Sequence, residues 1–244
     1  MLEGLYSAAA GMEAQQQRLD SISNDIANLD TPGYQADRVG FEDLLYSAAP
    51  ATQGSGVTVG AGSQVTSLGP SQVSAGVQQT GQPLDLAING NGYFEVKDAS
   101  GTTALTRNGE FQLDAKGQLV NGSGMIVQPP ITVPSGTSAS DVTVSGDGSV
   151  IVAGRTVGKI ALVTVPAPGQ LTPAGDSLLL PSSASGSPAA ATTATMIQGS
   201  LNNSDVDLAS SMTQMMDAEQ GYSMASKAID IQSQMLQIAN EVRG

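Results

Sequence analysis

The sequence predicts an α+β protein in which long helices at the two ends of the chain flank a mainly antiparallel β domain. Near each terminus, apolar residues recur every seven positions, which is the spacing of a coiled-coil seam. Between these regions, short runs of alternating apolar and polar residues are separated by Asn-Gly, Lys-Gly and Asp-Gly turn signals, as in antiparallel strands. A single β domain does not easily cover two helical stripes, so we expect the helices to pair with each other as a coiled coil.

The N-terminal helix is predicted over residues 2–29. Its heptad positions, all apolar except Gln15, are Leu5, Ala8, Met12, Gln15, Leu19, Ile22, Ile26 and Leu29. At 1.5 Å per residue such a helix is about 40 Å long. Asp30-Thr31-Pro32-Gly33 should end it, because proline cannot continue the backbone ladder and Pro-Gly suits the centre of a type II turn.

The C-terminal helix is predicted over residues 205–242. Ser204, followed three residues later by Asp207, resembles a capping box in its weaker aspartate form. The residues that repeat every seven positions are Leu208, Met215, Tyr222, Ile229 and Leu236, and Met212, Met216, Met235 and Val242 widen the stripe. The predicted helix is about 60 Å long.

The middle of the chain carries the β pattern. Strands are expected within residues 84–88, 93–96, 142–144, 150–152 and 160–165. Residues 181–194 are rich in Ser, Ala, Thr and Pro and are interpreted as a loop. The predicted domains are 1–34 (N-terminal helix and turn), 35–180 (β-rich domain), 181–203 (loop or linker) and 204–244 (C-terminal helix).

The composition excludes several classes of activity. The 244 residues include no cysteine, histidine or tryptophan, so the chain cannot form a disulfide framework, a Cys or His zinc site, or a Ser-His or Cys-His nucleophile. The net charge is −13 and the nine basic residues are scattered, which disfavours nucleic acid and anionic membrane surfaces as partners. No stretch has the ~20 apolar residues needed for membrane insertion. We expect no cofactor, no metal site and no enzymatic activity.

Three groups of motifs resemble the flagellar rod and hook protein family. They are Ser7–Met12 with Ser23–Asn28 and Thr31–Tyr34 near the N-terminus; Gln82–Ile88, Gly90–Phe94, Thr106–Gly109 and Leu113–Val120 in the β domain; and Gln198-Gly199, Asn203–Val206 and Met235–Gln237 near the C-terminus. The segments Phe41–Tyr46 and Met235–Gln237 are more similar to the distal than to the proximal rod members. The motifs cover both ends and the middle of the chain in the family's order, so together they are more specific than any single one.

The resemblance implies a structural subunit of the bacterial flagellar basal-body rod, of the distal type, that self-assembles helically through its terminal helices and transmits torque from motor to hook. A proximal rod subunit is the alternative within the family. The implied partners are further copies of the chain, neighbouring rod and hook subunits, and the flagellar export apparatus. The resemblance also implies export across the cytoplasmic membrane without a cleaved signal peptide. The N-terminus agrees, because Glu3 stands where a secretory signal has a basic region.

The helical stripes have two interpretations: packing within one chain, or seams that neighbouring subunits complete. Their position at both termini favours the second. The predicted subunit-interface residues are Leu5, Met12, Leu19, Ile22, Ile26, Leu29, Leu208, Met212, Met215, Tyr222, Ile229 and Leu236.

Two other function classes remain open. One is a coiled-coil binding module with a β head, unrelated to flagella. The other is a carbohydrate-active enzyme with two carboxylates, which the shortage of aromatic platforms disfavours: the chain has three phenylalanines and five tyrosines.

Overall fold

The computed structural model describes residues 2–44, 47–48, 58–59, 62–73, 75–134 and 136–243. Contacts within the chain divide it into two compact units. The helical unit contains Met1–Ala27, Arg38–Leu68 and Asp207–Gly244, and the β unit contains Asn28–Asp37 and Gly69–Val206. Residues 38–68, which the sequence pattern assigned to the β-rich domain, therefore belong with the helices. The α+β class is confirmed.

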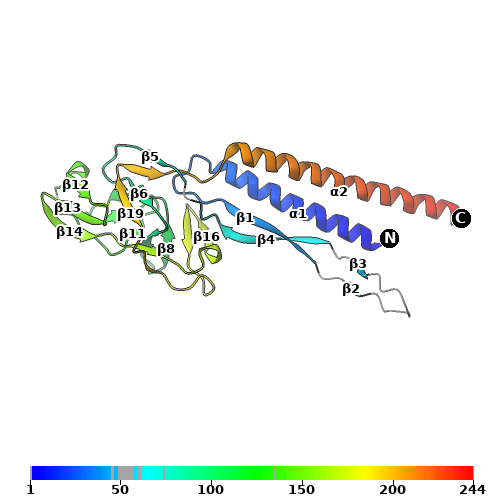
Figure 1. Cartoon of the computed structure of the whole chain (residues 1–244), viewed down its shortest axis with the longest axis horizontal. Coiled ribbons are helices and arrows are strands. Elements are labelled where there is room, and N and C mark those ends of the chain that lie inside the picture. The colour runs from blue at the N-terminus through cyan, green and yellow to red at the C-terminus, as the bar shows by residue number, and fades with distance from the viewer. Residues whose placement is uncertain are drawn as a thin grey trace. The chain divides into compact units, whose positions relative to one another are not determined.

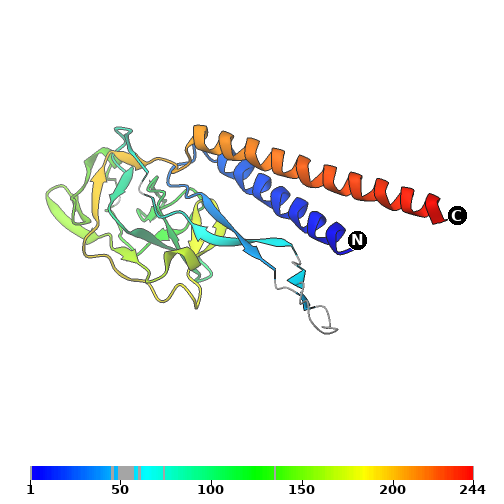
Figure 2. The same ribbon diagram turned by 45° about the vertical axis from the view of Figure 1, so that its right-hand side comes forward.

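Two long helices form most of the helical unit. α1 spans Leu2–Ala27 and α2 spans Leu208–Arg243; at 1.5 Å per residue they are about 39 and 54 Å long. They lie side by side, with the N- and C-terminal ends of the chain at the same end of the pair (Figures 1 and 2). Two short strand pairs complete the unit: β1 (Asp37–Asp43) with β4 (Ser63–Pro70), and β2 (Ser47–Ala48) with β3 (Thr58–Val59).

Close approaches at two glycines give the register of the helix pair. A methyl group added to Gly4 would lie 2.9 Å from Nε2 of Gln232, and one added to Gly221 would lie 3.0 Å from Cδ of Gln15. Moving forward along α1 therefore corresponds to moving backward by the same number of residues along α2. The helices are antiparallel, and a larger side chain at either glycine would require the facing glutamine side chain to move.

Local sequence determines where the helices begin and end. α1 stops two residues before its predicted end, and the N–H of Tyr34 donates to the carbonyl of Thr31 at 3.3 Å across the turn. Gly33 has a φ of +66°, which confirms the expected type II turn. α2 begins at Leu208, three residues later than predicted. Its cap is Asp207 and not Ser204, because Asp207 Oδ1 accepts from the N–H of Ala209 at 3.1 Å.

The β unit contains sixteen of the short strands in the described part of the chain. They are β5 (Val77–Gln79), β6 (Leu86–Asn89), β7 (Tyr93–Lys97), β8 (Thr103–Thr106), β9 (Gln112–Leu113), β10 (Leu119–Val120), β11 (Ile126–Val127), β12 (Val142–Val144), β13 (Ser149–Val152), β14 (Arg155–Lys159), β15 (Leu162–Thr164), β16 (Thr172–Gly175), β17 (Leu178–Leu180), β18 (Ala189–Ala190), β19 (Thr195–Gln198) and β20 (Ser200–Asn202). Two 3₁₀ turns, Ala139–Asp141 and Pro168–Gln170, connect some of them.

The largest sheet is built around β7. Its order is β16-β17-β8-β7-β11-β10-β9, and β15 pairs with both β7 and β18. Three smaller sheets are β12-β13-β14, β19-β6 and β20-β5, and the strand pairs within the β unit are antiparallel. This confirms the mainly antiparallel sheet that the turn signals predicted.

Both faces of β7 are buried. Phe94 points into the larger hydrophobic core and stacks edge-on against Phe111, with ring centroids 5.0 Å apart. Tyr93 belongs to a second cluster with Leu105 and Leu179 on the opposite face. Successive residues of a strand point to opposite faces, so Tyr93 and Phe94 each contribute to the core on a different face of β7.

The predicted linker is partly structured. Residues 181–203 include β18, β19 and β20, and Met196 is buried in the larger core. Asn202 is buried as well: its Oδ1 accepts from the N–H of Ile88 at 2.7 Å, and its Nδ2 donates to the carbonyl of Ile88 at 3.0 Å. These contacts join residues far apart in the sequence, which composition alone does not reveal.

Hydrogen bonds connect four segments of the β unit. These are the segments that are joined in sequence to α1, β1, β4 and α2. The N–H of Gly33 donates to the carbonyl of Asn202 at 2.8 Å, and the N–H of Ala36 donates to Oδ1 of Asp205 at 2.7 Å. The N–H of Ser71 donates to the carbonyl of Ala36 at 2.8 Å. These hydrogen-bonded segments of the β unit are called the junction.

A buried arginine lies near this junction. The guanidinium of Arg107 donates to the carbonyls of Gly90 at 2.6 Å and Gly92 at 3.3 Å, and its Cζ lies 5.7 Å from the centre of the Tyr93 ring. Burial lowers the pKa of Arg107, while Tyr93 and Asp205 act in the opposite direction. Burial likewise raises the pKa of Tyr93. Arg107 is thus a structural cation that holds the Gly90–Gly92 turn.

Candidate subunit interface

The structure places the predicted interface residues of α1 along the helix pair. Ile22 is buried, and Leu5, Met12, Leu19 and Ile26 are half-buried. Leu29 lies beyond the end of α1, within the β unit. Four of the apolar α1 residues therefore keep part of their surface open.

The predicted residues of α2 are more open. Met215 and Ile229 are half-buried, whereas Leu208, Met212 and Tyr222 are 38–53% exposed. The Leu236 side chain lies outside those the structure describes. The most covered line on α2 is a different heptad line made of smaller or polar residues: Ser211, Ala218, Ala225 and Gln232. We name it the contact line of α2.

The large apolar residues of both helices lie on one side of the pair. In α1, the line that faces α2 consists of Ala8, Gln15 and Ile22. Met12, Leu19 and Ile26 each come four residues after a residue of that line. Met215, Tyr222 and Ile229 each come four residues after a contact-line residue of α2. In an antiparallel pair, an equal rotation from both contact lines leads to the same side. The resulting seam face consists of Leu5, Met12, Leu19, Ile26, Leu208, Met212, Met215, Tyr222 and Ile229.

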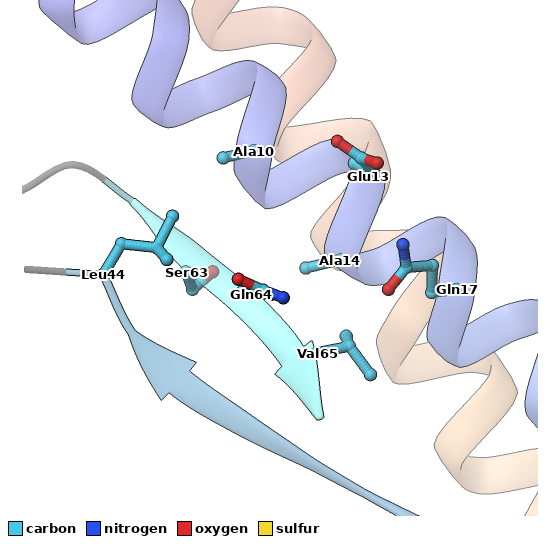
Figure 3. Close-up of a pocket in the computed structure, with 8 residues that line it drawn as sticks. All are labelled: Ala10, Glu13, Ala14, Gln17, Leu44, Ser63, Gln64 and Val65. Atoms are coloured by element: carbon cyan, nitrogen blue, oxygen red, sulfur yellow. The ribbon is translucent and has the colours of Figure 1, made fainter. Parts of the chain in front are cut away.

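The β1–β4 strand pair covers another side of α1. The guanidinium of Arg18 lies 5.8 Å from the centre of the Phe41 ring. A groove of about 260 Å³ separates α1 from β4, and Figure 3 shows Ala10 and Ala14 turned toward the strand. Its lining residues are Ala10, Glu13, Ala14, Gln17, Leu44, Ser63, Gln64 and Val65. The helix thus packs within the chain on two sides and leaves the seam face open.

A second exposed apolar line on α2 was not included in the predicted interface. Met224, Ile231, Met235 and Ile238 are 52–65% exposed, and we name them the tip face. The signal was present in the sequence, because Met224, Ile231 and Ile238 are seven residues apart. It was missed because the line through Leu208 and Leu236 is longer and dominates the pattern.

Within the described residues, no helix combines the length and apolar character required to cross a bilayer. Those residues also contain no group of three or more Asp and Glu side chains that could hold a metal ion.

Comparison with protein-family models gives three matches along the chain. The model described as flagella basal body rod protein matches residues 5–35. The flagellar hook protein FlgE/F/G D1 domain matches residues 87–152, and the flagellar basal body rod FlgEFG protein C-terminal model matches residues 197–242. The first and last matches cover most of α1 and α2, and the middle match lies within the β unit.

Curated relatives match over the full length. The flagellar basal-body rod protein FlgG of Caulobacter vibrioides is 37% identical, and the alignment covers 99% of this chain and 100% of that protein. FlgG of Buchnera aphidicola subsp. Acyrthosiphon pisum is 34% identical over 97% of this chain and 98% of that protein. The flagellar hook protein FlgE of Helicobacter mustelae is 39% identical over only 52% of this chain and 30% of that protein. Full-length agreement therefore favours the rod over the hook.

The chain has a long helix near each end and a β unit between them in the sequence. The rod and hook family models match these three parts in turn, which defines an axial protein of the flagellum. Within that class the chain belongs to the FlgG family of flagellar basal-body rod proteins, the distal rod proteins, and it is a structural subunit of the rod.

Proposed function

We propose that this rod subunit self-assembles helically with copies of itself through α1 and α2, and that the assembly transmits torque from motor to hook. The observation that carries the proposal is the open seam face. After α1 and α2 have packed on each other, Leu208, Met212 and Tyr222 still expose large apolar surface along one side of the pair. Burying apolar area contributes about 25 cal/mol per Å², so a neighbouring subunit on this side would be stabilised.

The contacts within the chain are consistent with helices that depend on neighbours. The residues between α1 and α2 are mostly small or polar, and among the described side chains of the two helices the buried apolar ones are Ala14, Ile22 and Ala218. Most helical stability in proteins comes from packing an apolar face. We therefore infer a coiled-coil arrangement that becomes complete only in the rod.

The proposal includes further partners. Neighbouring rod and hook subunits would contact the ends of the assembly, and the export apparatus would deliver the chain without a cleaved signal peptide. We further propose that the subunit has no catalytic activity, since a structural role accounts for the helices, the seam face and the family membership together.

The test compares two neighbouring positions on α2. Met212→Asp places a carboxylate in the seam face and should abolish incorporation into the rod, because an unpaired charge would be buried there. Thr213→Asp is the matched control: Thr213 is also exposed but lies outside the seam face. Swimming motility and the amount of subunit in purified basal bodies are the readouts. Normal incorporation of Met212→Asp, or equal loss with Thr213→Asp, would contradict a role for the seam face.

A further inference from the structure

The exposed apolar stripe of α2 changes sides along the helix. One heptad line reads Ser210, Asp217, Met224, Ile231 and Ile238, so it turns from polar to apolar. Another reads Met212, Glu219, Ser226 and Ser233, so it turns from apolar to polar. Most of the exposed apolar residues in the first half of α2 therefore lie on the seam face, and those in the second half lie on the tip face.

The tip face is well separated from the other two faces of α2. At 3.6 residues per turn, the tip face lies about 120° from the contact line and about 150° from the exposed part of the seam face. α1 cannot cover it, because α1 packs along the contact line. The register of Gly4 against Gln232 places the first residue of α1, Leu2, opposite residue 234. Met235 and Ile238 thus extend beyond the described part of α1.

We propose that the tip face of one copy docks on the seam face of the next copy in the rod. The proposal deepens and rests on the proposed self-assembly. Each face provides three apolar residues at heptad spacing: Leu208, Met215 and Tyr222 on the seam face, and Met224, Ile231 and Ile238 on the tip face. Parallel copies can interlock these lines when one is shifted by sixteen residues of α2, which is about 24 Å.

The position of the two faces explains why a second copy is the partner. A contact between identical faces has two-fold symmetry and closes a dimer. A contact between two different faces is heterologous, and each docked copy presents a free face to the next. Because the tip and seam faces differ in position along α2 and in direction around it, repeating their contact produces an open helical polymer. A rod requires such a polymer.

Engineered cysteines can test this pairing without background, since the chain has no cysteine. Cells co-express two full-length variants, Tyr222→Cys and Ile238→Cys, whose positions lie at the same level after the 24 Å shift. Basal bodies are purified, oxidised and analysed on a non-reducing denaturing gel. We expect a covalent dimer in the mixture and none with either variant alone. The matched control replaces Ile238→Cys by Gln237→Cys, which is at nearly the same level but rotated by about 100°, and should give no dimer.

A second pair, Leu208→Cys with Met224→Cys, repeats the test two heptads nearer the start of α2 and should also give dimers. Rods that assemble without either mixed dimer, or that give dimers from Tyr222→Cys alone, would overturn the pairing of faces and leave the proposed self-assembly standing. The control for the proposed self-assembly uses cells that express the chain without substitutions. If rods purified from these cells did not contain the chain, the proposed self-assembly itself would be overturned.

Discussion

At the scale of single residues, Gly33 occupies a position where the chain accepts no side chain. Its φ of +66° lies in the left-handed region. A methyl group added there would lie 2.3 Å from the backbone nitrogen of Asn108 and 2.4 Å from the carbonyl carbon of Arg107. The N–H of Gly33 also donates to Asn202, so the segment after α1 is held against the buried arginine's own backbone. Backbone conformation and close approach both require glycine.

These two requirements can be measured separately. Gly124 also has a positive φ, +79°, but a methyl group added there meets no atom within 4 Å. We expect Gly124→Ala to lower the free energy of unfolding by about 1–2 kcal/mol, from the backbone conformation alone. Gly33→Ala should cost about 2 kcal/mol more, because the chain around Arg107 must also move. Urea unfolding of both variants is the measurement, and equal losses would show that the close approach has no energetic consequence.

At the scale of elements, the sequence predicted the existence, type and approximate length of both helices, because four or five heptads give a strong periodic signal. It predicted the turn at Pro32-Gly33, since few residue pairs suit that geometry. It did not predict that Ala218 and its neighbours on the contact line face α1, because small residues contribute little to a hydrophobic pattern although they permit the closest helix approach. Nor did it show that the described residues between 38 and 68 belong to the same unit as the helices, since strand patterns carry no information about distant partners.

Helix stability should differ between the monomer and the rod. The described part of the α1–α2 pair buries few large side chains, whereas Phe94 and Leu105 at the centre of the β unit are fully covered. Amide exchange in α1 and α2 should therefore be fast in the isolated chain, slow in assembled rods, and slow in β7 and β8 in both states. Hydrogen exchange with mass spectrometry measures this directly. Slow exchange of both helices in a verified monomer would instead mean that assembly proceeds by docking of preformed helix pairs.

At the scale of the whole molecule, the boundary of the β unit follows long-range hydrogen bonds and not the composition of the chain. Residues 181–203 were predicted to be a linker because they begin with a Ser-, Ala-, Thr- and Pro-rich segment. Within them, however, Met196 is buried in the larger core and Asn202 pairs with both backbone groups of Ile88. On the N-terminal side, the N–H of Gly33 donates to the carbonyl of Asn202 and so connects residue 33 to the same part of the β unit. The β unit therefore consists of residues 28–37 and 69–206, although the strand pattern alone suggested that it ends near residue 180.

A pair of fragments tests this boundary. Residues 28–206 should fold cooperatively as a monomer, because the fragment keeps both cores and every hydrogen bond of the junction described above. Residues 35–200 lack Gly33, Asn202 and Asp205, so the backbone N–H and carbonyl of Ile88 and the N–H of Ala36 lose their partners. A buried group left without a partner costs about 1–3 kcal/mol, and the shorter fragment should unfold at a clearly lower urea concentration. The longer fragment carrying Asn202→Ala provides the control, because it removes the pairing with Ile88 and keeps the chain length; it should account for a large share of the loss. Equal urea midpoints for the two fragments would mean that the junction adds nothing to the stability of the β unit, and that its hydrogen bonds only order the segments leading to the helices.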